Sequence, residues 1–354
     1  MGRPKIAIVG AGAVGGYAGA YMARAGEDIT FIDPWPEHVE QMRKHGLRIT
    51  HGTSSEEFTT PVRALHLTEA QQLSKEAPID IAFVCMKSYD TAWATMMIRQ
   101  YLAPGAFVVS LQNCMNEETI ANVVGWGKVL GCIASVIGVE LCEPGHVRRA
   151  AGKSGSRHTV FRTGEVHGRT TDRVKEICRL VGLADSAMVT ENLWGERWSK
   201  LVTNVMGNGL SACTGMIGKE MVENDAIRHF SARLGSEAIR VGQALGYELE
   251  EIIHLDPEII ARAGEGDAAA TRQYDEHRLA EVSRGGGEHR PSMGQDMVKG
   301  RRTEIEFLNG LVAKKGEEIG IATPANVVLT DIVKRVERGE LKPDPRHITD
   351  LRLN

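Results

Sequence analysis

Short apolar runs alternate with helical segments through the first half of the chain. Lys5–Val9 is rich in β-branched residues and ends at a glycine, as a buried parallel strand does. The alanine-rich stretch Tyr17–Arg24 predicts a helix, and Asp28–Asp33 predicts a second strand that completes a β-α-β unit. The alternation continues with a helix expected over Thr91–Leu102 and with further strands expected at Ile79–Cys85, Ala106–Leu111, Val129–Val139 and His158–Glu165. This pattern predicts an α/β fold of the Rossmann type, with a doubly wound parallel sheet.

From about Leu193 the pattern changes to long helical windows with almost no strand signal. The expected helices are Trp194–Gly207, Asp225–Leu245, Pro257–Val282, Gly294–Gly320 and Thr323–Arg338. Between the third and the fourth, Arg284–Pro291 holds three successive glycines and a proline, which predicts a mobile loop with Gly285–Gly287 as a hinge. We therefore expect a sheet domain over residues 1–190 and an all-α domain over residues 191–354.

Composition places the chain among ordinary globular proteins. Its 354 residues include 42% hydrophobic and 25% charged side chains, which is enough for two domains with their own cores. A net charge of −4 offers no basic surface for nucleic acid or for a membrane. The six cysteines lie singly, and neither a secretory leader nor a membrane span is expected. We expect a cytoplasmic protein without nucleic-acid or membrane partners, and whether it forms a homodimer stays open.

The first expected strand runs directly into a G-x-G-x-x-G fingerprint. Its residues are Gly10, Gly12, Ala13, Val14 and Gly15. Between a strand and a helix, such glycines allow a tight turn, the close approach of a pyrophosphate and the packing of helix on strand, whereas the alternative is a turn with no ligand. Asp33 ends the second strand, where a carboxylate accepts hydrogen bonds from ribose hydroxyls and repels a 2′-phosphate. The cofactor expected is NAD, and NADP is not excluded because Arg24 or Arg43 could pair with a phosphate.

Polar residues also follow two later strands of the expected sheet. Lys87 comes after Ile79–Cys85, and Asn113 comes after Ala106–Leu111. The carboxyl ends of parallel strands border the crevice where such sheets bind ligands, so both are candidate binding residues. A solvated lysine and a turn-forming asparagine are the alternatives.

A polar stripe is expected on the first helix of the second domain. Lys200, Asn204 and Asn208 follow one another at i, i+4 and i+8, which places one ammonium and two carboxamides on one helix face. Leu201 and Val205 would face the core. A solvated face is the alternative, but repeated asparagine is a poor helix former, which favours a functional role.

Together these motifs resemble the ketopantoate reductase, or 2-dehydropantoate 2-reductase, family over nearly the whole chain. The matching segments are the glycine fingerprint, Lys87, Leu111-Gln112-Asn113, Trp198-Ser-Lys200-Leu with Asn204 and Asn208, Pro291-Ser292-Met-Gly-Gln-Asp296, and Thr303-Glu304-Ile305 through Asn309-Gly310. The resemblance implies a nicotinamide-dependent reductase of a small 2-oxo acid, with 2-dehydropantoate as the first candidate substrate.

The resemblance also implies roles for single residues. Lys200 matches a lysine that acts as general acid toward the carbonyl oxygen, and Glu304 matches an acidic residue near that lysine and the substrate. The implied catalytic residues are Lys200, Glu304 and Asn113; the implied substrate-binding residues are Asn204, Asn208 and Ser292; and Lys87 and Asn113 join the fingerprint and Asp33 in binding the cofactor. No metal site is expected, because the twelve histidines show no paired ligand spacing.

The chain departs from the family pattern at several places, among them Met216–Glu220, which lacks an asparagine that many members carry there. Asp33 stands where NADPH-using members carry arginine, Gly209 follows Asn208 where proline is common, and extra length lies between Leu249 and Gly287. Two alternatives therefore stay open. One is the same fold and cofactor acting on another 2-oxo or hydroxy acid, and the other is an NAD-sensing protein without turnover, which would have no use for Lys200.

Overall fold

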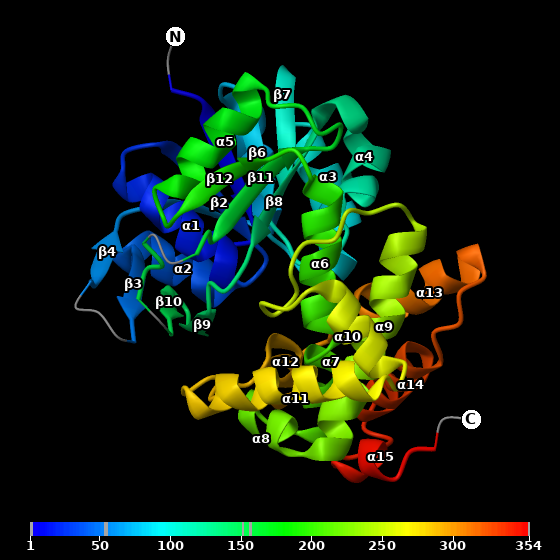
Figure 1. Ribbon diagram of the computed structural model, residues 1–354. Helices are drawn as coiled ribbons and strands as arrows, with labels where there is room; N and C mark the ends of the chain where they lie inside the picture. The colour runs from blue at the N-terminus through cyan, green and yellow to red at the C-terminus, as the bar shows by residue number, and fades with distance from the viewer. Residues whose placement is uncertain (1–2, 53–55, 151, 156–157, 353–354) are drawn as a thin grey trace. The chain divides into compact units, whose positions relative to one another are not determined.

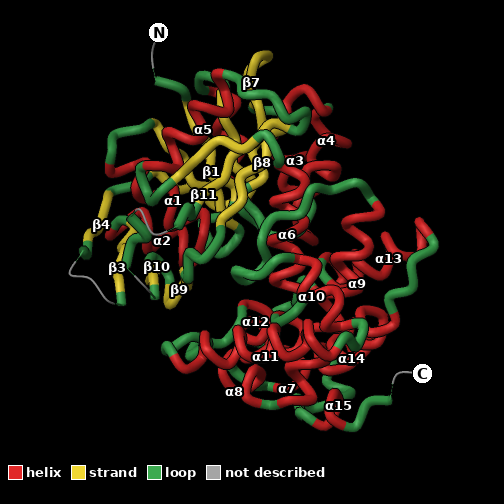
Figure 2. The backbone as a smooth tube through the Cα atoms, in the orientation of Figure 1, coloured by secondary structure: helices red, strands yellow, loops and turns green. Residues whose placement is uncertain are grey.

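The computed structural model describes residues 3–52, 56–150, 152–155 and 158–352. Its internal contacts divide the chain into two compact units, Met1–Leu193 and Trp194–Asn354. Strands and helices mix in the first unit, whereas the regular elements of the second are helices, as the colours of Figure 2 show. The expected α/β unit followed by a helical region is confirmed.

An eight-stranded sheet forms the centre of the first unit, in the order β12-β11-β8-β7-β6-β1-β2-β5. Strands β6, β8 and β11 of this sheet are labelled in Figure 1. The strands of the sheet are β1 (Lys5–Val9), β2 (Asp28–Asp33), β5 (Arg63–His66), β6 (Ile79–Val84), β7 (Leu102–Ser110), β8 (Val129–Ala134), β11 (Phe161–Glu165) and β12 (Ala187–Thr190). Every neighbouring pair is parallel except β11 with β8. The order β7-β6-β1-β2 therefore sets four carboxyl ends side by side at one edge of the sheet.

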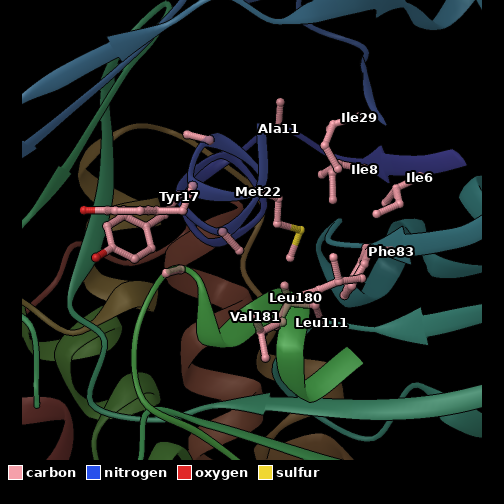
Figure 3. Close-up of a cluster of buried hydrophobic side chains, with 14 of the residues drawn as sticks. Ile6, Ile8, Ala11, Tyr17, Met22, Ile29, Phe83, Leu111, Leu180 and Val181 are labelled. Atoms are coloured by element: carbon pink, nitrogen blue, oxygen red, sulfur yellow. The ribbon is translucent and has the colours of Figure 1, made fainter. Parts of the chain in front are cut away.

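Alternate side chains of these strands face two separate cores. On one face the strands pack against helices α1 (Ala13–Arg24), α2 (Pro36–His45) and α5 (Asp172–Gly182). On the other face they pack against α3 (Thr91–Arg99), α4 (Glu117–Val124) and the 3-10 helix η1 (Leu67–Lys75). The first unit also contains two short 3-10 helices, η2 (Ser88–Asp90) and η3 (Trp126–Lys128). Figure 3 shows Met22 of α1 and Leu180 of α5 gathered with Ile8 and Phe83 of the strands. Burial on both faces explains why the strands read as continuous apolar runs.

A second sheet of four short strands was not anticipated from the sequence. Its order is β4-β3-β10-β9, with β3 (Leu47–His51), β4 (Phe58–Thr60), β9 (Val139–Glu143) and β10 (His146–Arg149). The single strand expected over Val129–Val139 is wrong, because the chain leaves β8 and turns through left-handed Val136 and Gly138 into this other sheet. Buried Arg149 donates to the Tyr17 hydroxyl at 2.9 Å and pairs with Asp185, which ties the small sheet to α1.

Of the five helical windows expected in the second unit, three are confirmed close to their expected bounds and two are divided; the confirmed ones are Trp194–Gly207, Asp225–Leu245 and Thr323–Arg338. The helices of this unit are α6 (Leu193–Val205), α7 (Asn208–Thr214), α8 (Gly218–Glu223), α9 (Asp225–Ala244), α10 (Pro257–Gly264), α11 (Ala268–Ser283), α12 (Ser292–Val298), η4 (Ile305–Phe307), α13 (Asn309–Ile319), α14 (Pro324–Glu337) and α15 (Arg346–Thr349). The helix expected over Pro257–Val282 breaks where Gly266 takes φ +93° and Asp267 caps α11 by accepting the Ala270 N–H at 2.8 Å. The window Gly294–Gly320 likewise divides into α12, η4 and α13. Within the described ranges, no helix has the length and apolarity to cross a lipid bilayer.

The glycine-rich loop after α11 is anchored rather than free. Gly287 O accepts the Lys219 N–H at 2.8 Å, His289 O accepts the Gly218 N–H at 3.4 Å, and the Arg290 side chain donates to Gly215 O. These carbonyls satisfy N–H groups in the first turn of α8, which an isolated helix leaves without partners. Of the three glycines expected to form a mobile hinge, Gly287 is therefore held against α8, whereas the N–H groups of Gly285 and Gly286 bond back to α11.

Candidate functional site

Four of the candidate segments meet at the carboxyl edge of the main sheet. β1 leads to Gly10, β2 ends at Asp33, β6 leads to Lys87 and β7 leads to Asn113. These strands are neighbours in the sheet and run parallel. The structure therefore brings the sequence-predicted residues of the first unit to one edge, where open parallel sheets bind ligands.

The three fingerprint glycines differ in what surrounds them and therefore in why a side chain is absent at each position. Gly10 takes φ +99°, and a Cβ on it would lie 2.7 Å from the sulfur of Met86. A Cβ on Gly15 would lie 2.7 Å from Cys85 Cβ, so that glycine allows α1 to pack closely on β6. At Gly12, by contrast, no atom lies within 4 Å of the Cβ position. The fold itself needs Gly10 and Gly15, while the open space at Gly12 fits the approach of a phosphate group to the start of α1.

Asp33 holds the glycine loop as well as its own turn. Its side chain is 7% exposed. Oδ2 accepts the Ala11 N–H at 2.8 Å and Oδ1 accepts the Trp35 N–H at 2.9 Å. Each carboxylate oxygen keeps a second lone pair that a ribose hydroxyl can use. The capping role and the ribose-binding role are therefore compatible.

A buried polar network braces the segments that carry Lys87 and Asn113, and sequence reasoning assigned it no role. Gln112 Nε2 donates to Met86 O at 2.7 Å and to Thr91 Oγ1 at 2.9 Å. Asn116 Nδ2 donates to Asn113 O at 2.7 Å and to Ser88 Oγ at 3.1 Å. The sequence feature that could have indicated this network is the cluster of polar residues that follows each of the two apolar strands. This network fixes both loops against each other.

The stripe expected from Lys200 to Asn208 is interrupted. Lys200 and Asn204 lie one turn apart on α6, but α6 ends at Val205 and Asn208 begins α7 after a break at Gly207. Leu201 and Val205 are buried, as the pattern predicts. Asn208 is thus not on the same continuous helix face as the other two, which corrects the i+8 assignment.

Lys200 and Asn204 are the most chemically distinctive pair of the helical unit. Lys200 is only partly accessible, and burial lowers the pKa of its ammonium below the usual lysine value. No described residue of this unit forms an ion pair with it. Asn204 is 9% exposed, and its buried Nδ2 has no hydrogen-bond partner among the described residues. A desolvated proton donor and an unused amide donor suit an oxygen-rich ligand.

The remaining candidates of this unit, Asn208, Glu304 and Ser292, lie on segments that pack around α7. Gly209, next to Asn208, packs so tightly on Ile305, next to Glu304, that a Cβ would lie 3.1 Å from Ile305 Cδ1. Asn208 and Glu304 are both buried. Ser292 is exposed at the start of α12, and Arg290 near it bonds to Gly215, beyond the end of α7. Gly294 of α12 packs directly against Ser211 of α7, so the segment of Ser292 adjoins that of Asn208 although the Ser292 side chain is exposed.

The comparisons with known proteins agree with one another along nearly the whole chain. Residues 6–159 match the family model described as ketopantoate reductase PanE/ApbA, and residues 192–337 match the model of its C-terminal part. A 2-dehydropantoate 2-reductase from Archaeoglobus fulgidus is 31% identical over 95% of this chain and 98% of its own.

Solved structures show the same likeness. The crystal structure of a PanE/ApbA family ketopantoate reductase from Ralstonia eutropha JMP134 matches with a TM-score of 0.76 and 26% identity, covering 95% of this chain and 99% of that one. A ternary structure of D-mandelate dehydrogenase with NADH and anilino(oxo)acetate matches with a TM-score of 0.75 over 95% of this chain and 99% of its own. At 23% identity, the second match speaks for the fold alone.

Proposed function

The chain belongs to the ketopantoate reductase family, and from that premise we propose that it reduces 2-dehydropantoate to pantoate with NADH. The observation that carries the proposal is Lys200, a lysine of lowered pKa one turn from the unpaired amide of Asn204. A reductase of a 2-oxo acid needs a proton donor for the carbonyl oxygen, and a desolvated lysine gives up its proton more readily than an exposed one.

The first unit supplies residues that fit a nicotinamide dinucleotide. The open side of Gly12 and the first turn of α1, with Ala13 and Val14, would take the pyrophosphate. Asp33 would accept the ribose hydroxyls, and Lys87 and Asn113 would border the nicotinamide end of the same sheet edge. The bound cofactor supplies a hydride to the carbonyl carbon.

The second unit supplies the groups for the substrate. Lys200 Nζ gives one proton to the carbonyl oxygen, which becomes the hydroxyl of the product, and the neutral amine then recovers a proton from water. The amide of Asn204 donates a hydrogen bond to the substrate, and Asn208 and Ser292 bind its hydroxyl and carboxylate ends. Glu304 contributes a buried carboxylate that orients the lysine and the substrate. With this set, the chain positions and protonates the substrate.

Asp33 favours NADH over NADPH. A carboxylate about 4 Å from a 2′-phosphate costs on the order of 4 kcal/mol per unit charge at an effective dielectric near 20. Because both oxygens of Asp33 are fixed by backbone N–H groups, the side chain cannot turn away without leaving Ala11 and Trp35 unpaired.

One observation favours a second candidate substrate. The extra segment before Ser292 forms α10 and α11, and Arg228 Nε of α9 donates to Asp275 Oδ1 of α11 at 2.7 Å. This segment is thus an ordered part of the helical unit, directly before a substrate-binding candidate. A different 2-oxo or hydroxy acid, handled by the same residues, is the alternative.

The deciding experiment is a steady-state assay of the purified protein. We expect oxidation of NADH in the presence of 2-dehydropantoate, with kcat/KM at least tenfold higher for NADH than for NADPH. A panel of 2-oxo acids with smaller, larger and aromatic side chains serves as the control. Efficient turnover of another member with little on 2-dehydropantoate would reject the substrate, and binding of NADH without turnover on any member would favour a sensor.

A further inference from the structure

His38 is a fully buried residue of α2 that connects two loops distant in the sequence. Its Nδ1 accepts the Gly145 N–H from the turn between β9 and β10 at 2.8 Å. Its Nε2 lies 2.9 Å from Ala11 O in the glycine loop. Since a carbonyl oxygen only accepts hydrogen bonds, Nε2 carries the ring proton and donates it to Ala11.

The Ala11 carbonyl belongs to the same peptide unit as the Gly12 N–H. In a planar trans peptide these two groups point in opposite directions, and no cis peptide occurs in the described chain. By holding the oxygen, His38 therefore also sets the direction of the Gly12 N–H. That N–H has no hydrogen-bond partner among the described residues, and the space around the Gly12 Cβ position is open.

The preceding peptide is held as well, because Asp33 accepts the Ala11 N–H. Both peptide units of Ala11 are thus fixed by side chains before any ligand arrives. If the peptide between Ala11 and Gly12 turned over, a carbonyl oxygen would face the position that a phosphate needs. A preformed orientation avoids this repulsion and the cost of ordering the loop on binding.

We infer that His38 is a positioning residue for the pyrophosphate of the dinucleotide. It acts through the Ala11 carbonyl, which it holds so that the Gly12 N–H is presented to a phosphate oxygen. The inference rests on the proposed dinucleotide cofactor, but on neither the identity of the 2-oxo acid nor the chemistry at Lys200.

Two substitutions separate positioning from a general contribution to the fold. Asparagine places an acceptor near the Nδ1 position, so His38→Asn keeps the bond to Gly145 and loses the one to Ala11. Glutamine reaches the Nε2 position, so His38→Gln keeps a donor for Ala11 and loses the acceptor for Gly145. Each variant leaves one buried group unpaired, so the two are matched in structural damage.

We expect the affinity for ADP-ribose, measured by calorimetry, to fall about tenfold in His38→Asn and to stay within about threefold of wild type in His38→Gln. Adenosine, which has no phosphate, is the control ligand and should bind all three proteins equally. Equal ADP-ribose affinities in the two variants, or a matching loss for adenosine, would overturn the inference.

A measurement on the unmodified protein covers the case in which His38→Asn does not fold. The amide resonance of Gly12 should shift when ADP-ribose binds and not when adenosine binds, and an unchanged resonance would equally overturn the inference. Neither assay contains a 2-oxo acid, so a wrong substrate assignment leaves both readouts intact. A wild-type chain that fails to bind ADP-ribose would overturn the inference together with the proposed cofactor.

Discussion

The buried environment of Lys200 disfavours the charged form of its side chain. Burial is the cause of its lowered pKa, and Asn204 one turn away offers an amide rather than a carboxylate. A general acid must be protonated to act, so reduction should be fastest below the pKa of this lysine and decline as the pH rises through it. Because that pKa is lowered, the decline should begin at a lower pH than an ordinary lysine would give.

Replacing Lys200 by alanine should lower kcat by about 10²- to 10⁴-fold and remove the alkaline decline from the pH profile. The dissociation constant of NADH, measured by fluorescence titration, should change little. Lys314→Ala is the matched control, since that lysine is 70% exposed on α13 and pairs only loosely with Glu318. A Lys200→Ala enzyme with the wild-type kcat and pH profile would contradict the role of this residue.

At the scale of elements, the contact between α8 and the loop after α11 decides whether that loop can act as a hinge. Gly287 takes φ +81°, and a Cβ there would lie 2.7 Å from the backbone nitrogen of Lys219. Gly246, which follows α9, takes φ +80° with no atom within 4 Å of its Cβ position. The two glycines share a backbone conformation and differ in what surrounds them.

Alanine at Gly246 should therefore cost about 1 kcal/mol of unfolding free energy, and alanine at Gly287 about 2–4 kcal/mol, because only the second also collides with backbone. Urea unfolding of the two variants measures both values. Similar losses would mean that the loop moves away from α8 at little cost, and the hinge expected from its three glycines would be restored.

At the scale of the whole molecule, the proposed cofactor residues and the proposed acid lie in different compact units. A ligand that binds the native first unit stabilises it by mass action, independently of any group that acts only in the chemical step. ADP-ribose at a hundred times its dissociation constant should thus add about 2.7 kcal/mol to the opening free energy of β1 and β6.

Hydrogen exchange of the amides in these two central strands measures that gain. The variant Lys200→Ala is the control, and it should show the same gain because its substitution lies in the second unit. An absence of added protection in β1 and β6 would place the dinucleotide elsewhere. Loss of the gain in the variant would assign Lys200 to cofactor binding rather than to proton transfer.

The sequence by itself determined the elements whose signals are local. The apolar run Lys5–Val9, the fingerprint after it and Asp33 at the end of the next strand required only short-range patterns, since strands buried on both faces must be apolar throughout. The change to helical periodicity near Leu193 was equally visible. The family resemblance followed from the order of these motifs.

Only the tertiary structure decided the features that depend on distant contacts. His38 reads as one more residue of a short helix until Ala11 and Gly145 are seen on either side of its ring. Asn208 has the spacing of a continuous helix, yet the chain breaks at Gly207. The second sheet likewise pairs β3 with β10, strands nearly a hundred residues apart. Periodicity reports which face of a segment is buried but not which partner covers it, so pairing, helix ends and buried hydrogen bonds are fixed only when the whole chain packs.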